Sequence, residues 1–243
     1  MVIYDRIAPY YNRVLSRPFF AFLRPAIMSI FETYGIHRRS RILEVACGPG
    51  HLCAYLADRA FDITGCDLSI GQRLASSHRQ SFPFVVSRMQ NLPFRQPFDV
   101  ILNLYDSLNH LLTLSDLSST FDETYRLLVP GGWFIFDTNT KLAFKRIWGS
   151  RTPFIHEESD FTMVMETRYS SGTRMSEAIV TVRDGEGEIV STLKERYFTP
   201  GEIRNNLKNS GLGLVDKIPW CPSKDAYHGL AVKDIWIARR PDV

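Results

Sequence analysis

The order of apolar segments between residues 41 and 139 limits most strongly what this chain can fold into. Five short runs rich in Val, Ile and aromatic residues alternate there with segments whose apolar residues recur at helical spacing. Such alternation predicts βαβ units, in which helices cover both faces of one parallel sheet. The predicted strands are RILEVACG (41–48), FDITGCD (61–67), FPFVVS (82–87), FDVILNLY (98–105) and GGWFIFDTN (131–139), and the predicted helices are 51–60, 70–80 and 115–130.

The segments on either side of this region follow other patterns. Residues 1–40 predict helices, with Pro25 suited to a first turn and Gly35 to a C-terminal stop. After Thr140 the chain changes to apolar/polar alternation, which predicts a small antiparallel sheet. Its strands are expected at 161–170, 174–184 and 189–198, followed by a helix that opens at Thr199-Pro200 and by two last strands at 211–220 and 230–240.

Charge and cysteine content exclude several classes of function. With 29 basic and 26 acidic residues the net charge is +3, and the densest basic patch (37–41) is best explained as a solvated connection. We therefore expect no nucleic-acid partner. The cysteines (Cys47, Cys53, Cys66 and Cys221) form no Cys-x-x-Cys pair, so we predict buried thiols and no metal site.

The N-terminal segment has neither the charge nor the apolar run of a signal peptide. The apolar stretch from Phe19 to Phe31 is interrupted by Arg24 and Pro25, and it is short for a bilayer span. We expect a cytoplasmic protein without a membrane partner, as a monomer or homodimer.

The segment Ile42-Leu43-Glu44-Val45-Ala46-Cys47-Gly48-Pro49-Gly50 runs from a buried strand into a glycine turn and a helix. In an open α/β sheet this strand end lies where ligands bind. One hypothesis is a degenerate dinucleotide fingerprint, but Cys53 replaces its third glycine. Glu44 disfavours a pyrophosphate and favours a cationic ligand, as S-adenosylmethionine is at its sulfonium and α-ammonium groups.

The chain resembles the class I S-adenosylmethionine-dependent methyltransferases in several blocks that occur in the expected order. After the glycine turn come Gly65-Cys66-Asp67, Asn91-Leu92-Pro93-Phe94, residues 98–104 and residues 125–134. Tyr4-Asp5-x-x-Ala8-x-x-Tyr11-Asn12 and Tyr105-Asp106-Ser107-Leu108-Asn109-His110 are similar to segments of small-molecule members, some of which carry a β-sheet cap.

The resemblance implies an α/β, Rossmann-like, doubly wound fold. It predicts a seven-stranded, mostly parallel sheet with N-terminal helices and a small inserted antiparallel β-sheet. Residues 1–140 and 200–243 would form the cofactor-binding domain, with 1–40 as a helical lid or flank. Residues 141–199 would form an inserted antiparallel β cap over the substrate site.

The resemblance also implies how S-adenosylmethionine is held. The glycine turn would wrap its methionine part, Asp67 would accept from both ribose hydroxyls, and Leu68 would pack on the adenine. The residues expected to bind the cofactor are Tyr11, Glu44, Ala46, Gly48, Gly50, Asp67, Leu68, Met89, Asn103 and Leu104.

Three departures from the family pattern concern this site. Ala46 replaces the first glycine of the turn, and Gln72-Arg73 replace an apolar pair after the ribose strand. Arg88 stands where an acidic residue normally meets the adenine amino group. Arginine has no acceptor, so adenine recognition would rest on the Met89 backbone and on apolar packing.

Methyl transfer from a sulfonium is an in-line displacement, so positioning and exclusion of water matter most. A base is needed only if the acceptor arrives protonated. The candidates are Tyr105, Asp106 and His110, although Asp106 and the nearby Asn109 are also residue types that bond loop backbone. From the cap come His156, Glu157 and His228, and Trp148 and Trp220 are candidates for the acceptor pocket.

The sequence therefore favours methyl transfer to an N or O nucleophile of a small molecule, with S-adenosylhomocysteine as the product. Two alternatives remain open at this point. One is an NAD-dependent oxidoreductase built on the same glycine turn, which Glu44 disfavours. The other is a non-catalytic S-adenosylmethionine-binding protein. It stays open because Arg88 stands where the family usually has an acidic residue.

Overall fold

A seven-stranded sheet in the order β10-β11-β5-β4-β1-β2-β3 forms the centre of the computed structural model, which describes residues 3–77 and 81–242. Strands β1 to β5 are parallel, and β11 runs antiparallel to both β5 and β10. This confirms the predicted seven-stranded, mostly parallel sheet. The strands are β1 (Arg41–Val45), β2 (Asp62–Asp67), β3 (Phe84–Val86), β4 (Phe98–Asn103), β5 (Leu128–Asn139), β10 (Gly213–Trp220) and β11 (Lys233–Arg239).

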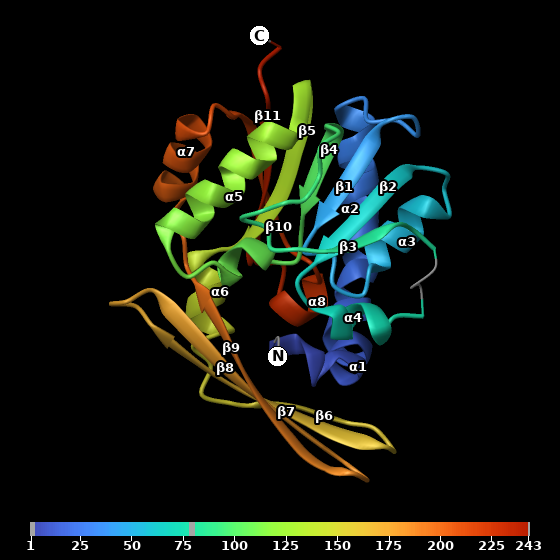
Figure 1. Ribbon diagram of the computed structural model, residues 1–243. Coiled ribbons are helices and arrows are strands. Elements are labelled where there is room, and N and C mark those ends of the chain that lie inside the picture. The colour runs from blue at the N-terminus through green and yellow to red at the C-terminus, as the bar shows by residue number, and fades with distance from the viewer. Residues whose placement is uncertain (1–2, 78–80, 243) are drawn as a thin grey trace.

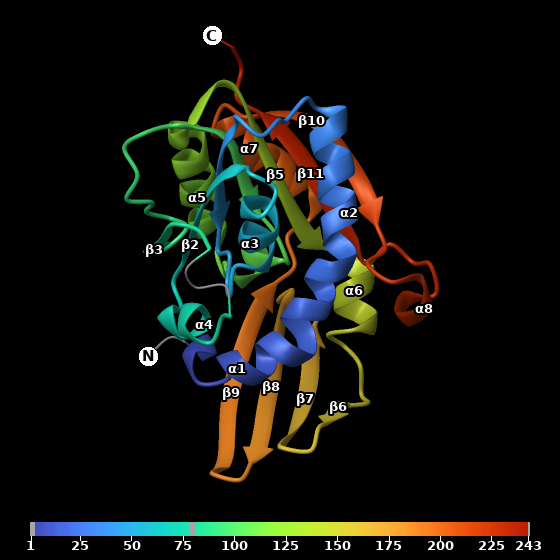
Figure 2. The ribbon, with the colours of Figure 1, turned by 90° about the vertical axis from the view of Figure 1, so that its right-hand side faces the viewer.

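Helices cover both faces of this sheet (Figures 1 and 2). On one face α2 (Arg17–Thr33) and α3 (His51–Ala57) pack their apolar side chains into one core cluster. On the other face α5 (Leu114–Leu127) and α7 (Pro200–Asn209) form a second cluster with the sheet. Each sheet face is thus buried against helices, as the nearly continuous apolar strands require.

A second, antiparallel sheet in the order β6-β7-β8-β9 lies beyond the carboxyl ends of the parallel strands (Figure 1). Its inward-facing apolar residues, including Met163 and Val180, pack against Ile7 and Val14 of the N-terminal segment. The inserted sheet is therefore present, with β6 (Phe154–Glu157), β7 (Phe161–Ser170), β8 (Met175–Asp184) and β9 (Gly187–Arg196).

Short elements connect the two sheets and surround the space between them. Of these, η3, α6 and α8 had not been predicted, and neither had the strand β6 of the second sheet. The short elements are η1 (Ile3–Asp5), α1 (Ala8–Tyr11), η2 (Asn12–Ser16), α4 (Ile70–Leu74), η3 (Ser107–His110), α6 (Lys141–Arg146) and α8 (Lys224–Tyr227).

Three predicted details of the helices are wrong. Pro25 lies inside α2 rather than in its first turn, because the helix is already continuous with the π-helical turn η2 before it. Helix α5 ends at Leu127 and β5 starts at once, so residues 128–130 are strand and not helix. Helix α4 ends at Leu74, and residues 78–80 of the predicted helix lie outside the described residues.

The N-terminal helical segment Ala8–Thr33 has the length and hydropathy of a membrane span. Its side chains Phe20, Leu23, Ile27 and Phe31 are buried in the core cluster on the α2 face of the sheet. Packing in this fold thus accounts for the apolar residues on that side of α2.

Candidate cofactor and acceptor site

A cavity of about 260 Å³ opens at the carboxyl ends of β1, β2, β3 and β4. This is the edge of an open α/β sheet at which ligands bind. We call it the cofactor cavity. Its walls come from the glycine turn, the ends of the strands and the N-terminal segment, and include Tyr4, Tyr11, Ala46, Cys47, Gly48, Asp67, Leu68, Ser69, Gln72, Ser87, Arg88, Met89, Gln90, Tyr105 and His110.

Gly48 shapes the floor of the cofactor cavity. Its φ of +54° is a left-handed conformation that glycine adopts without strain, and a Cβ at this position would enter open space. The Gly48 N–H donates to Asp67 Oδ2 at 2.7 Å, and this hydrogen bond joins the glycine turn to the end of β2. Gly50 does not line the cavity, but a Cβ there would lie 2.1 Å from the Phe82 ring.

Asp67 presents a carboxylate into the cofactor cavity. Its Oδ1 accepts from Ser69 N at 2.7 Å, and burial raises its pKa despite these backbone hydrogen bonds. A carboxylate has about four acceptor positions, so acceptor capacity remains for two vicinal hydroxyls. Two further wall atoms, Gln72 Oε1 and Ser87 Oγ, are buried without a hydrogen-bond partner within the described part of the chain. Groups of this kind fit a polar nucleoside.

Four residues expected to bind the cofactor do not line the cavity, namely Gly50, Glu44, Asn103 and Leu104. Glu44 is only 1% exposed and accepts from Cys53 Sγ at 2.9 Å, and burial raises its pKa to about 7. Asn103 Nδ2 donates to the Val45 carbonyl at 3.2 Å, and Leu104 is part of the core. These side chains support the turn from behind.

Arg88, Gln72 and Arg73, which depart from the family pattern, do not all face the cofactor cavity. Arg88 and Gln72 face the cofactor cavity, as does Met89. Arg73 instead lies over the rings of Phe82 and Phe84 and donates to the Phe82 carbonyl at 3.1 Å. Arg73 is therefore a packing residue that holds the segment before β3.

The N-terminal segment is attached at the cofactor cavity through Asp5. Its Oδ1 accepts from Ser69 Oγ at 2.6 Å and from Gly71 N at 3.0 Å, at the start of α4. This attachment brings the rings of Tyr4 and Tyr11 together at 5.1 Å, edge to face. Asn12 also bonds His51 on α3.

A second cavity of about 420 Å³ adjoins the first, and Tyr4, Tyr11 and Tyr105 line both. We call it the acceptor cavity. Most of its wall is apolar or aromatic, and its charged members are Asp106, Glu195 and Lys233. The wall also includes Val14, Leu15, Phe19, Phe22, Asn139, Ile147, Trp148, Met165, Thr167, Leu193 and Tyr227.

The structure brings some of the predicted acceptor-site residues together and leaves others apart. Trp148 lines the acceptor cavity, whereas Trp220 packs edge-on against Phe19. His156, on β6, forms a hydrogen bond with Glu158 at 3.1 Å. Neither His156 nor Glu157 lines the acceptor cavity. His228 is exposed beyond α8.

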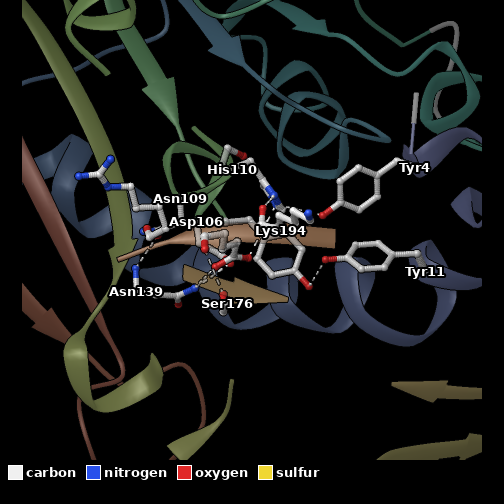
Figure 3. Close-up of polar contacts among 12 residues, drawn as sticks. Tyr4, Tyr11, Asp106, Asn109, His110, Asn139, Ser176 and Lys194 are labelled. Atoms are coloured by element: carbon white, nitrogen blue, oxygen red, sulfur yellow. Dashed lines mark hydrogen bonds and ion pairs between the residues drawn. The ribbon is translucent and has the colours of Figure 1, made fainter. Parts of the chain in front are cut away.

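A buried polar cluster forms one end of the acceptor cavity. Figure 3 labels two of its members, Asp106 and Asn139. Lys233 Nζ donates to Asp106 Oδ1 at 2.6 Å and to Asp137 Oδ2 at 2.9 Å. Asn139 Nδ2 donates to Asp106 Oδ2 at 2.9 Å and to Glu195 Oε2 at 3.0 Å. Residues from β5, β9, β11 and the loop after β4 thus meet at one point.

The carboxyl groups of this cluster have different proton affinities. Burial favours the protonated form of Asp106, but Lys233 outweighs it and the pKa of Asp106 is lowered. Burial and repulsion from Asp106 raise the pKa of Asp137, which Lys233 offsets in part. Burial and the neighbouring Asp106 raise the pKa of Glu195 well above its usual value. The structure thus favours a proton on Glu195 and a charge on Asp106.

His110 connects this cluster with the cofactor cavity. Its Nδ1 lies 3.1 Å from the Lys194 carbonyl, which only accepts, so Nδ1 carries the proton. Its Nε2 therefore accepts from the Tyr4 hydroxyl at 3.0 Å. Burial lowers the pKa of His110, although Asp106 opposes this, so the ring is neutral at pH 7.

Sequence reasoning found Asp106 and His110 but not Asp137, Glu195 or Lys233. The last two follow in the chain only after the inserted sheet has begun, at positions where resemblance gives little guidance. The strands that carry Glu195 and Lys233 each contain a pattern that indicates a buried position. Glu195 takes an inward position on β9 after the buried Ser191 and Leu193, and Lys233 begins a strand that is buried almost throughout.

Comparison with known proteins agrees with this geometry. Residues 42–132 match the family model described as a methyltransferase domain. The chain is 28% identical over 226 residues to YqeM of Bacillus subtilis (strain 168), which is provisionally named a methyltransferase, covering 88% of this chain and 87% of YqeM. The chain is a class I S-adenosylmethionine-dependent methyltransferase.

Solved structures share the fold of this methyltransferase. A Clostridium acetobutylicum ATCC 824 S-adenosylmethionine-dependent methyltransferase superimposes with a TM-score of 0.78 at 20% identity, over 98% of this chain and 99% of the other. CalS10 is a Micromonospora echinaspora amino pentose methyltransferase solved with S-adenosylmethionine bound. It superimposes with a TM-score of 0.72 at 20% identity, over 99% of this chain and 97% of CalS10. Because the chain is an S-adenosylmethionine-dependent methyltransferase, its cofactor is S-adenosylmethionine, and the nicotinamide alternative is set aside.

Glu44→Gln is expected to stabilise the cofactor-free methyltransferase at pH 8. The pKa of Glu44 is raised to about 7, so the folded state holds a proton that the unfolded state releases above about pH 4.5. Wild-type stability should therefore fall between about pH 4.5 and pH 7, by about 3 kcal/mol in total. Urea unfolding at pH 5 and pH 8 measures this difference.

Two further measurements complete this test. The exposed Glu32→Gln should shift stability by less than about 0.5 kcal/mol at either pH. Titration calorimetry should show weaker S-adenosylmethionine binding by Glu44→Gln, since a negative charge behind the turn attracts a cation. An unchanged affinity would show that Glu44 acts on folding alone.

Lys233→Met is expected to lower the free energy of unfolding by about 3–5 kcal/mol, because it leaves Asp106 and Asp137 buried without their cation. Lys217→Met is the matched control on β10. It breaks the partly exposed pair with Asp234 and should cost less than about 1 kcal/mol. Equal losses in chemical denaturation would mean that the cluster is not held by charge.

Proposed function

We propose that this methyltransferase transfers a methyl group to an N or O nucleophile of a small molecule bound in the acceptor cavity. The observation that carries this proposal is the shared wall of Tyr4, Tyr11 and Tyr105. A nucleophile in the acceptor cavity would meet the cofactor methyl group between these rings. The volume of the cavity, about 420 Å³, suits a small molecule.

We assign direct contacts with the cofactor to those predicted residues that line its cavity, namely Tyr11, Ala46, Gly48, Asp67, Leu68 and Met89. Glu44, Gly50, Asn103 and Leu104 would act through the turn that they support. Gln72 and Ser87 add acceptor atoms that could meet the nucleoside where Arg88 cannot.

The inserted sheet would serve as the cap of the acceptor site. Strands β7 and β9 supply Met165, Thr167, Leu193 and Glu195 to the acceptor cavity. The division into a cofactor-binding domain (1–140 and 200–243) and a cap (141–199) remains our proposal. CalS10, which shares this fold, is an amino pentose methyltransferase, and an acceptor of that size would fit the space.

When bound, S-adenosylmethionine supplies a methyl group on a positively charged sulfur that leaves as a neutral thioether. The protein's part is to align the acceptor, exclude water and receive a proton. The Tyr4 hydroxyl can accept the acceptor's proton while it donates its own to His110 Nε2, since the two atoms are 3.0 Å apart. His110 is thus the base, and Tyr4 relays the proton.

The proposed function predicts binding and turnover that can be measured separately. S-adenosylmethionine, and not NAD, should raise the melting temperature of the protein. Asp67→Ala should weaken that binding by about tenfold or more through loss of the ribose contacts. A panel of small amines and alcohols should then yield S-adenosylhomocysteine with at least one member, detected by mass spectrometry. Binding without turnover of any small acceptor would contradict the proposal.

His110→Ala is expected to lower kcat for a protonated acceptor by about 10²-fold or more. The pKa of His110 lies below 6.5, so wild-type kcat should be flat at neutral pH and should fall only as the pH drops below that value. The variant should lose this acid limb and keep its affinity for S-adenosylhomocysteine. His156→Ala, on the cap strand β6, serves as the control and should leave kcat unchanged; a normal kcat in His110→Ala would remove the histidine from the reaction.

A further inference from the structure

Carboxyl groups outnumber cations at the polar end of the acceptor cavity. Asp106 and Glu195 line this end, Asp137 is buried behind it against Lys233, and among the described residues that line the cavity Lys233 is the only cation. The other titratable groups that face Glu195 are neutral at pH 7. They are His110 from η3, Tyr4 and Tyr11 from the N-terminal segment and Tyr105 from the loop after β4.

Lys233 forms its ion pairs with carboxylates other than Glu195. Its ammonium group contacts Asp106 at 2.6 Å and Asp137 at 2.9 Å. The side chain of Glu195 is 2% exposed. It contacts the uncharged Asn139 amide at 3.0 Å, the neutral His110 ring at 3.8 Å and the Asp106 carboxylate, which accepts a hydrogen bond from the protonated Glu195. Glu195 is thus a buried acid that faces a cavity without a cation of its own.

Such a group can be satisfied in two ways. Without a ligand it keeps a proton, because a second negative charge beside Asp106 in a buried site is unfavourable. A cation in the cavity reverses this preference, since attraction between opposite charges is strong where water is excluded. The aromatic faces of Phe19, Phe22 and Trp148 on the same wall also favour a cation over a neutral group.

We infer that the methyl acceptor is an amine, and that Glu195 binds its ammonium form beside the three tyrosines that separate the two cavities. This inference rests on the proposed function and narrows its N or O nucleophile to nitrogen. Glu195 is thus a substrate-binding residue that the inserted sheet contributes.

The proton balance of the reaction is consistent with this role. Binding of R–NH₃⁺ expels the Glu195 proton to solvent and forms an ion pair. One ammonium proton then passes through Tyr4 to His110 Nε2 and leaves the nitrogen lone pair free. The N–C bond forms as the C–S bond breaks, so the positive charge returns to nitrogen as R–NH₂⁺–CH₃, again facing Glu195, and His110 releases its proton to water.

A matched pair of probes tests the inference without knowledge of the natural acceptor. With the protein saturated in S-adenosylhomocysteine, cyclohexylamine should bind at least about tenfold tighter than cyclohexanol, which has the same ring and no charge. Affinities are measured by ligand-observed NMR and calorimetry. Calorimetry at pH 7 in two buffers of different ionisation enthalpy should also show that amine binding releases a proton.

Glu195→Gln should abolish both effects while keeping the hydrogen bond from Asn139, which the Gln carbonyl oxygen can accept. Amine affinity should fall at least about tenfold, alcohol affinity should stay the same, and proton release should disappear. Glu188→Gln, on the exposed end of the same strand, is the control and should behave as the wild type. The melting temperature of each variant verifies folding.

Equal binding of the amine and the alcohol, no binding of the amine, or amine binding unaffected by Glu195→Gln would each overturn the inference. Efficient methylation of an alcohol from the acceptor panel, with no methylated amine, would do the same. Those results would leave the proposed function intact, because S-adenosylmethionine binding and turnover are measured independently of Glu195.

Discussion

The ion cluster around Lys233 is the interaction on which the arrangement of the acceptor cavity depends. Lys233 comes from β11, Asp137 from β5 and Asp106 from the loop after β4, and Asn139 extends the cluster to Glu195 on the second sheet. A buried cation between two carboxylates tolerates little displacement, since each unpaired charge in this environment is costly. One side chain thus fixes the relative positions of the central sheet, the loop that carries His110 and the inserted sheet.

The backbone near this cluster is strained in a way that the cluster explains. Tyr105 and Asp106 have φ values of +62° and +50°, a left-handed conformation that non-glycine residues seldom adopt. The Asp106 N–H donates to Asp137 at 3.1 Å while the Asp106 side chain is held by Lys233 and Asn139. The Tyr105 ring stacks on Phe19 at 4.1 Å. These contacts turn the chain sharply after β4, so that Tyr105 faces both cavities and His110 reaches Tyr4.

The central sheet and most of the cofactor cavity could be predicted from sequence because they depend on local patterns. Each strand from β1 to β5 is a short apolar run, and Gly48 and Asp67 stand at strand ends that parallel pairing must bring together. Glu44 shows the limit of this reasoning. Its place before the turn suggested a direct contact with the cofactor, but strand alternation directs the side chain to Cys53 behind the turn.

The acceptor cavity could be predicted only in part, because its wall is assembled from residues that no local pattern connects. Asp106 and His110 were found through the segment that follows β4. Their partners Glu195 and Lys233 lie 89 and 127 residues after Asp106, and both look like ordinary charged residues of strands. Only the pairing of β11 with β5 and the docking of β9 beside η3 place them at the same point.

The acidic excess of this wall has a consequence for catalysis that goes beyond binding. In the methylation of an amine, positive charge develops on the acceptor nitrogen as the bond to carbon forms. Fixed negative charge behind that nitrogen stabilises the charge as it appears, and its orientation costs nothing at that moment because the cluster is already held by Lys233 and Asn139. An alcohol that has lost its proton arrives with a negative charge and is repelled by the same wall. Asp106 and Glu195 would thus favour nitrogen twice, first by binding the ammonium and then in the transition state.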